Sequence, residues 1–167
     1  MTTRDKGVGI NRYLVSTIAK REVFIPSGTK AENIGKILHM QQWLGTIPQT
    51  DYPLKHHFAP GLYGREIFIP AGDCVAGKMH RHSHLNTISK GHVLVMTENG
   101  LLEFKAPITF TSPAFVKRVV YAHEDTIWTT YHVTDKIDLA EIEAEIIMPE
   151  TEIVRRMQML AIEGAES

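Results

Sequence analysis

Histidine is the residue type that most strongly suggests chemistry in this sequence. The chain has nine histidines in 167 residues, and four of them fall between His80 and His92. Imidazole is a good ligand for Zn, Cu, Fe and Ni, and it exchanges protons near neutral pH. This run of histidines therefore makes a metal site or a polar binding pocket the first hypotheses to consider.

The spacing of these histidines sets a geometric condition on any metal site. On a strand, alternate side chains share a face, so the even-numbered residues from Lys78 to His84 would point the same way. At about 3.3 Å per residue, His80 and His84 would lie about 13 Å apart on a straight strand. They can share one metal ion only if the chain bends between them and another strand supplies a third ligand.

The segment around these histidines has the pattern of an all-β domain. From about Tyr63 to Val133, short runs rich in β-branched and aromatic residues alternate with turn signals, and Glu98-Asn99-Gly100 is a strong hairpin signal. Trp128 lies on the last of these runs, and we expect it to face the core. The single cysteine, Cys74, is expected to be a small buried residue. The pattern predicts a β-sandwich or barrel.

Helical patterns flank this β segment on both sides. A capping box, Thr29 to Glu32, begins an apolar stripe that ends near Leu44, and Gly45 is expected as a left-handed cap. Residues 21–26 resemble a short strand. Three segments are thus predicted: an N-terminal arm and helix (1–55), a barrel (56–135) and a helical segment (136–167).

The C-terminal segment is expected to form two helices. Asp138 is in position to cap the first of them, and Pro149 interrupts it. The second helix is expected to begin near Thr151 and to end near Gly164. Its apolar stripe suits docking onto another element better than binding a cofactor.

Charge and composition exclude several classes of function. Eighteen basic and nineteen acidic residues give a net charge of −1, which excludes a generally basic nucleic-acid binder. No apolar run approaches the length of a membrane-spanning helix. The N-terminus lacks the apolar core of a signal peptide, so we expect no secretion, and one cysteine suits a reducing compartment. Residues 1–50 are basic and residues 136–167 are acidic, which makes the ends candidate contact surfaces.

The spacing of the histidine run resembles that of the cupin superfamily over residues 61–133. Cupins are small jelly-roll (double-stranded β-helix) barrels whose first motif places Gly, His, His, Glu and Gly at fixed intervals. In this chain those positions hold Gly72, Lys78, His80, His84 and Gly91. The spacing of the second cupin motif, Pro-x-Gly-x-x-His-x-x-x-Asn, matches residues 113–122. The resemblance implies a mainly β, cupin-like jelly-roll barrel, with a turn that bends the chain between the histidines.

The residues in the ligand positions depart from the cupin pattern. Lys78 replaces the first histidine, His84 replaces the glutamate, and Arg118 replaces the histidine of the second motif. A lysine coordinates a metal only after losing its proton, and an arginine effectively never does. Only His80 keeps the residue that the resemblance leads us to expect.

Three interpretations of this altered constellation remain open. In the first, His80 and His84 bind a divalent transition metal (Zn, Fe, Ni or Mn) together with His123 or His132. In the second, Lys78 and Arg118, with His82 as a neighbour, bind a small anionic ligand. In the third, these residues are structural hydrogen-bonding groups and the barrel holds no cofactor.

A narrower resemblance concerns small cupin-like proteins encoded by tailed bacteriophages and prophages. It rests on residues 56–72, 77–93 and 117–135, of which AHEDTIWTT is the most distinctive part. It implies a phage-associated protein with a non-enzymatic assembly, structural or accessory role, located in the host cytoplasm or the virion. The terminal segments would contact further copies of the chain or phage structural proteins. The alternatives are a metal-dependent cupin enzyme (oxygenase, isomerase or hydrolase) acting on a small molecule, and a binder of a small anion.

Overall fold

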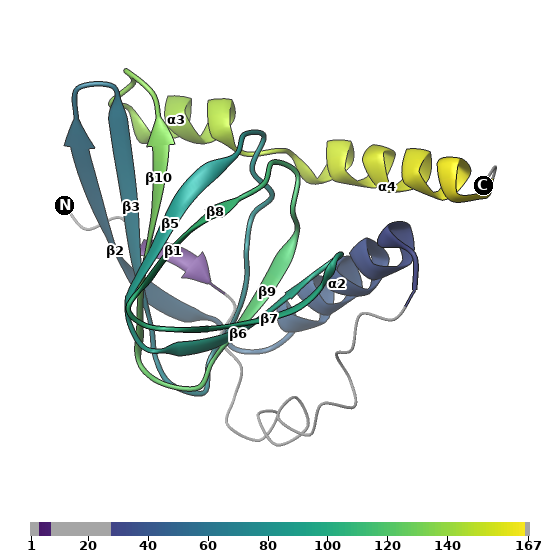
Figure 1. The fold of residues 1–167 in the computed structure, drawn as a ribbon, viewed down its shortest axis with the longest axis horizontal. Coiled ribbons are helices and arrows are strands. Elements are labelled where there is room, and N and C mark those ends of the chain that lie inside the picture. The colour runs from purple at the N-terminus through teal and green to yellow at the C-terminus, as the bar shows by residue number, and fades with distance from the viewer. Residues whose placement is uncertain (1–3, 8–27, 166–167) are drawn as a thin grey trace.

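The structure is a computed structural model that describes residues 4–7 and 28–165 (Figure 1). The strand predicted over 21–26 lies outside the described residues. The strands are β1 (Arg4–Gly7), β2 (Thr50–Ala59), β3 (Leu62–Ile69), β4 (Cys74–Ala76), β5 (His84–Lys90), β6 (His92–Thr97), β7 (Gly100–Lys105), β8 (Ile108–Ser112), β9 (Arg118–Ala122) and β10 (Thr126–Val133). The helices are α2 (Lys30–Leu44), α3 (Leu139–Ile146) and α4 (Glu150–Ala165).

The strands form two antiparallel sheets that face each other (Figure 1). One has the order β1-β2-β3-β10-β5-β8 and the other the order β4-β9-β6-β7. From β3 to β10 the chain passes repeatedly between the sheets, which produces the eight-strand jelly-roll arrangement found in cupins. The predicted fold class, a mainly β jelly-roll barrel flanked by helices, is confirmed. The first sheet also extends back to Thr50, at the start of β2, because β2 pairs with β3.

The core of the barrel lies between the inner faces of the two sheets. Alternate residues of each strand point inward, as expected for sheets with one buried face. The main cluster contains Tyr52, Ile69, Ile88, Val93, Val95, Val120, Ala122 and Trp128. Trp128 faces the core as predicted, and Cys74 is buried as predicted.

Helix α2 covers the outer face of the second sheet. Its capping box forms as predicted: the Thr29 amide donates to Glu32 Oε2 at 2.7 Å, and the Glu32 amide donates to Thr29 Oγ1 at 3.3 Å. Gly45 does not adopt the predicted left-handed conformation, because its φ is −66°. Gln49 Nε2 donates to the Leu44 carbonyl at 3.1 Å, so the end of the helix is capped by a side chain instead.

The C-terminal helices cover one end of the barrel and one face of α2 (Figure 1). The side chain of Asp138 accepts a hydrogen bond from the Glu141 amide and caps α3 as predicted, and Pro149 separates α3 from α4. Helix α3 lies over the end of the barrel, where Ile142 and Ile146 pack against Tyr63. Helix α4 packs on α2, so the C-terminal segment is part of the folded body.

The link between α3 and α4 is attached to the histidine run. The Arg81 amide donates to the Ile146 carbonyl at 2.8 Å, and the Met148 amide donates to the Met79 carbonyl at 2.9 Å. These bonds hold His80, which forms a bridge with Ile147, at the covered end of the barrel. No helix among the described residues is long and apolar enough to cross a membrane.

The turn between β5 and β6 generates a stability prediction, because Gly91 adopts a φ of 104°. A Cβ atom there would lie 2.7 Å from Thr126 Cα and 2.8 Å from the Asp125 carbonyl oxygen. We expect Gly91→Ala to lower the free energy of unfolding by about 3 kcal/mol or more. Gly100→Ala is the matched control: its φ is also positive but its surroundings are open, so strain alone should cost about 1–2 kcal/mol. Equal losses in urea unfolding would contradict this explanation.

Candidate functional site

Three histidine rings meet inside the covered end of the barrel. His80 precedes β5, His84 begins β5, and His132 lies near the end of β10. The ring centroids of His80 and His84 are 4.2 Å apart, and His132 lies 5.0 Å from His80 and 4.9 Å from His84. The chain therefore bends between His80 and His84, as the predicted site required. All three side chains are buried.

The hydrogen bonds of His84 determine its protonation state. Its Nδ1 lies 3.1 Å from the His82 carbonyl oxygen, and its Nε2 lies 3.2 Å from an Nη2 of Arg118. A carbonyl only accepts and a guanidinium only donates. His84 is therefore neutral, with Nδ1–H as the donor and Nε2 as the acceptor, and both of its ring nitrogens are engaged.

Arg118 is a buried cation of the barrel interior, with only 6% of its surface exposed. Besides His84, its guanidinium donates to Ser112 Oγ at 3.2 Å and lies 5.6 Å from the centroid of the Trp128 ring. Each of these three contacts is with a neutral group. Burial lowers the pKa of Arg118 to about 10, so the guanidinium still carries its positive charge at neutral pH.

A second layer of polar side chains fixes the partners of Arg118. The indole Nε1 of Trp128 donates to Asn86 Oδ1 at 2.9 Å, and Asn86 Nδ2 donates to Ser112 Oγ at 3.0 Å. Asn86 and Ser112 are both buried, and they lie on the neighbouring strands β5 and β8. This chain of hydrogen bonds fixes the position of the guanidinium relative to strands β5, β8 and β10.

The histidine rings remain uncharged in this environment. Burial is the main cause that lowers the pKa of each ring, and the positive charge of Arg118 adds to it in all three. The pKa of His132 falls to about 4, and that of His80 falls far below its usual range. Nδ1 of His80 is buried and has no hydrogen-bond partner among the described residues.

A cavity of about 330 Å³ lies between the rings of His80 and His132 and helix α3. Its polar lining comes from His56, Tyr63, Arg65, Lys78, His80, His132 and Glu143. Its apolar lining comes from Leu54 on the sheet and from Leu139, Ala140, Ile142, Ile146 and Ile147 on and beside α3. The volume lies within the range of small-molecule sites in proteins, about 300–1,000 Å³.

Hydrogen bonds and ion pairs hold the polar lining of the cavity in place. Tyr63 Oη lies 2.7 Å from His56 Nδ1. Lys78 forms an ion pair with Glu143 of α3, which closes the rim between the barrel and the helix. Glu143 also raises the pKa of Arg65, whereas burial, the larger effect, lowers it.

The residues predicted from the sequence separate into distinct places. His80, His84 and His132 come together, and Arg118 is bonded to one of them, His84. Lys78 lines the rim, and exposed His82 lines a neighbouring hollow together with His84 and His132.

His123 does not join the histidine rings in the barrel. It follows β9, whose other end carries Arg118, so it lies at the opposite end of the barrel beside His92. The proposed combination of His80 and His84 with His123 is therefore excluded by the direction of β9.

The interior group does not fit the metal that the cupin resemblance implies. Both nitrogens of His84 are engaged, and one of them accepts a hydrogen bond from a cation that a metal ion would have to displace. Lys78, in another ligand position, is paired with Glu143. Among the described residues, ligand atoms gathered closely enough for a metal ion occur instead at His92, Glu103 and His123.

Arg65, Tyr63 and Glu143 all line the cavity, and none of them belongs to the motifs from which the site was predicted. The sequence did carry a signal for Arg65. In β3, alternate residues share a face, so Arg65 points to the same inner face as Tyr63 and Ile69, where a charged residue is unusual. Glu143 had no comparable signal, since its role depends on where α3 lies over the barrel.

Comparisons with known proteins add structural neighbours of low sequence identity. No family model matches the chain, and no curated protein matches it. Ectoine synthase from P. lautus is similar at 13% identity over 61% of this chain and 80% of that chain, with a TM-score of 0.48. A second similar structure is an acetylacetone dioxygenase from Acinetobacter johnsonii, at 14% identity over 56% of this chain and 75% of that chain, with a TM-score of 0.45. A third is an RmlC-like cupin from Shewanella frigidimarina, at 16% identity over 52% of this chain and 78% of that chain, with a TM-score of 0.43.

The charge of Arg118 generates a prediction about the neighbouring rings. In Arg118→Met, which removes the guanidinium and keeps an apolar side chain, we expect the pKa values of His80, His84 and His132 to rise. NMR titration of the imidazole resonances measures this. Arg81→Gln is the control, because it removes a guanidinium that pairs with Glu152. An unchanged pKa of His84 in Arg118→Met would contradict the assigned contact.

The buried neutral state of His132 makes stability depend on pH. Its pKa is about 4 in the folded protein and about 6.5 when unfolded, so unfolding takes up a proton between these values. Stability should therefore fall as the pH falls from about 6.5 to about 4, and His132 alone should account for about 3 kcal/mol. We expect His132→Gln to flatten this dependence in urea unfolding at several pH values. An equal flattening in His39→Gln, which alters an exposed histidine, would refute the assignment.

Proposed function

We propose that the barrel binds a small organic anion, one with an acidic group and an apolar body, in the cavity beneath α3. The observation that carries the proposal is the lining itself. Two cationic side chains, Arg65 and Lys78, face one carboxylate, Glu143, and the buried charge of Arg118 lies behind the histidine rings. An anion is the ligand that this electrostatic field favours.

The shape and polarity of the cavity support an amphipathic ligand. One wall consists of aliphatic residues of α3 and of Leu54, and the opposite side carries the imidazoles and cationic groups. A carboxylate placed toward Arg65 would leave its hydrocarbon part against Ile142 and Ile146. Such a division, an apolar wall with a few convergent polar groups, is typical of small-molecule sites.

The histidine rings would act as hydrogen-bonding groups for this ligand. His80 and His132 line the cavity and are neutral, so each of these two rings has one N–H donor and one acceptor nitrogen. Nδ1 of His80 is buried and has no hydrogen-bond partner among the residues that the structure describes. A bound carboxylate or hydroxyl group would supply the hydrogen-bond partner that the His80 ring lacks.

Access to the cavity would require only a local opening at its rim. The Lys78–Glu143 ion pair closes the rim, and its side chains are 40% and 56% exposed. Exposed ion pairs contribute about 0–1 kcal/mol, so breaking this one costs little. Lys78 would then be able to exchange Glu143 for the acidic group of the ligand.

A metal-dependent reaction is less well supported by this geometry than binding. The close approach of His80, His84 and His132 is the feature that would favour it, but the guanidinium on His84 opposes a metal ion. The phage-associated assembly role predicted from the sequence stays a prediction, as do the oligomeric state and contacts through the terminal segments.

The ligand class can be tested by thermal unfolding with paired probes. We would use monocarboxylates of about 6–12 non-hydrogen atoms, such as benzoate, each beside its neutral amide, with inorganic phosphate as a bare anion. At ten times its Kd, a carboxylate should stabilise the protein by about 1.4 kcal/mol and raise Tm by about 3–6 °C. The amide should have little effect.

Variants locate the binding to the cavity. Arg65→Met and the rim variant Lys78→Met should each weaken the response to the carboxylate, whereas Arg81→Met, outside the cavity, should keep it. Three results would overturn the proposal: no response to any carboxylate, equal responses to acid and amide, or a full response in both cavity variants.

A further inference from the structure

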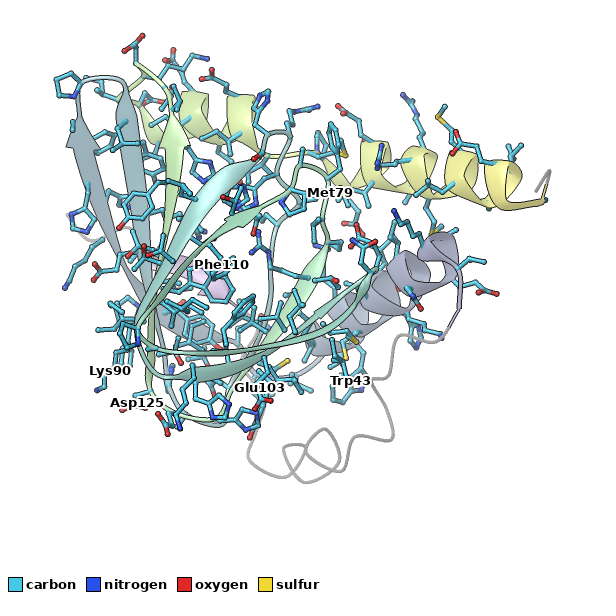
Figure 2. All side chains as sticks on the ribbon, in the orientation of Figure 1. Trp43, Met79, Lys90, Glu103, Phe110 and Asp125 are labelled. Carbon is cyan, nitrogen blue, oxygen red and sulfur yellow. The ribbon has the colours of Figure 1, made fainter. Side chains whose placement is uncertain are left out.

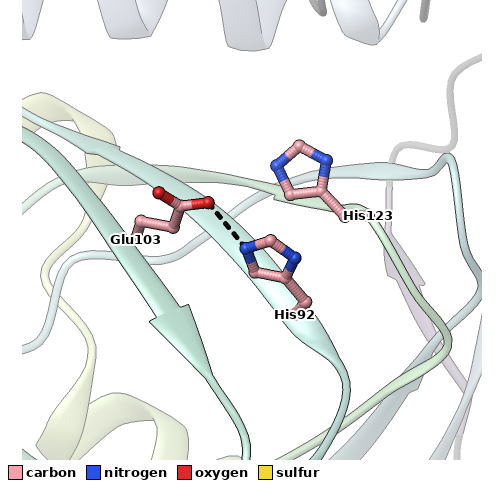
Figure 3. Close-up of side chains that lie close together, drawn as sticks. All are labelled: His92, Glu103 and His123. Carbon is pink, nitrogen blue, oxygen red and sulfur yellow. Dashed lines mark hydrogen bonds and ion pairs between the residues drawn. The ribbon is translucent and has the colours of Figure 1, made fainter.

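A second group of ligating side chains lies at the end of the barrel opposite α3. His92 begins β6, Glu103 lies on β7, and His123 follows β9. Figure 2 shows Glu103 and Asp125 at this end, and Figure 3 shows His92, Glu103 and His123 gathered on one side of the sheet. This group is separate from the cavity of the proposed function.

Strand register explains why these three side chains meet. Strand β6 lies between β7 and β9, with Leu94 opposite Glu103 and Val93 opposite Ala122. Val93 and Ala122 point into the core, so the side chains of the adjacent residues His92 and His123 are directed to the outer face. Glu103 is the diagonal neighbour of His92 on that face.

Short distances join the three groups. His92 Nε2 lies 2.6 Å from Glu103 Oε1, and the rings of His92 and His123 have centroids 4.6 Å apart. One ligand atom from each residue lies within 4.8 Å of the other two. The His123 amide also donates to the His92 carbonyl at 2.8 Å, which fixes the two backbones relative to each other.

We infer that His92, Glu103 and His123 form a binding site for a divalent transition-metal ion, with Zn²⁺ as the ion that the ligand set suits best. Two imidazoles and one carboxylate are a known protein ligand set for zinc, with nitrogen and oxygen at about 2.0–2.2 Å. In a tetrahedral site, two such ligand atoms lie about 3.4 Å apart. The His92–Glu103 pair would have to open by less than about 1 Å, which exposed Glu103 allows by side-chain rotation.

The surroundings of the site determine what the ion would do. Tyr121 packs edge-on against His123, with ring centroids 4.9 Å apart, and restricts its orientation. Glu103 and His123 are exposed, so the remaining coordination position faces solvent and would hold water or an external ligand. The ion would tie together three adjacent strands near Gly91, where the β5–β6 turn lies against the β9–β10 turn.

Zinc binding by the untagged full-length protein tests the inference. Competition with a chromophoric chelator should show one Zn²⁺ per chain, and His123→Ala and Glu103→Gln should each weaken binding by at least about tenfold. His39→Ala, which removes an exposed histidine of α2, is the matched control and should bind like the parent protein. His80→Asn, in the barrel interior, should also retain the ion.

Spectroscopy provides a second readout that does not depend on affinity. On addition of Zn²⁺, the imidazole nitrogen resonances of His92 and His123 should shift, and those of His132 should not. The inference is overturned if the parent protein binds no Zn²⁺, if His123→Ala binds it with unchanged affinity, or if His80→Asn loses it. The first two results leave carboxylate binding untouched. Loss of Zn²⁺ in His80→Asn would place the ion beside the cavity and would count against both proposals.

Discussion

The hydrogen bond from the Arg118 guanidinium to His84 Nε2 is the contact on which the barrel interior depends. It engages the last ring nitrogen of His84, fixes the tautomer, and places a buried positive charge beside His80 and His132. The hydrogen-bond partners of the guanidinium are neutral, and Glu98 is the carboxylate that acts on its charge. On the function proposed here, this charge favours an anion in the cavity. The histidines that the resemblance in sequence led us to expect around a metal ion are joined here to a cation supplied by the chain itself.

Two further parts of the structure act together with this contact: a polar network that holds the guanidinium, and a helix that encloses the cavity beside the histidine rings. The network from Trp128 through Asn86 to Ser112 fixes one side of the guanidinium, and helix α3 covers the cavity on the other side of the histidine rings. At the opposite end of the barrel, the other sheet carries His92, Glu103 and His123 on its outer face. One jelly roll thus separates an interior suited to anions from an outer face suited to a metal cation.

Much of the fold could be predicted from local signals, because capping boxes, strand alternation and motif spacing act over a few residues. Thr29, Asp138, Pro149 and Trp128 all take the predicted roles, and the bend between His80 and His84 is present. The division of the histidines was not predictable in the same way. Whether His123 or His132 joins the interior group depends on the direction of β9 and β10 across the barrel. Glu143 became part of the rim only through the docking of α3.

Crystals grown with both Zn²⁺ and a carboxylate that raises Tm would test the central claim most directly, by anomalous diffraction at the zinc edge. We expect one anomalous peak among His92, Glu103 and His123, no peak at the interior rings, and the Arg118 guanidinium still bonded to His84. A zinc ion about 2.0–2.1 Å from the nitrogens of His80, His84 and His132, with Arg118 displaced, would contradict this account of the barrel.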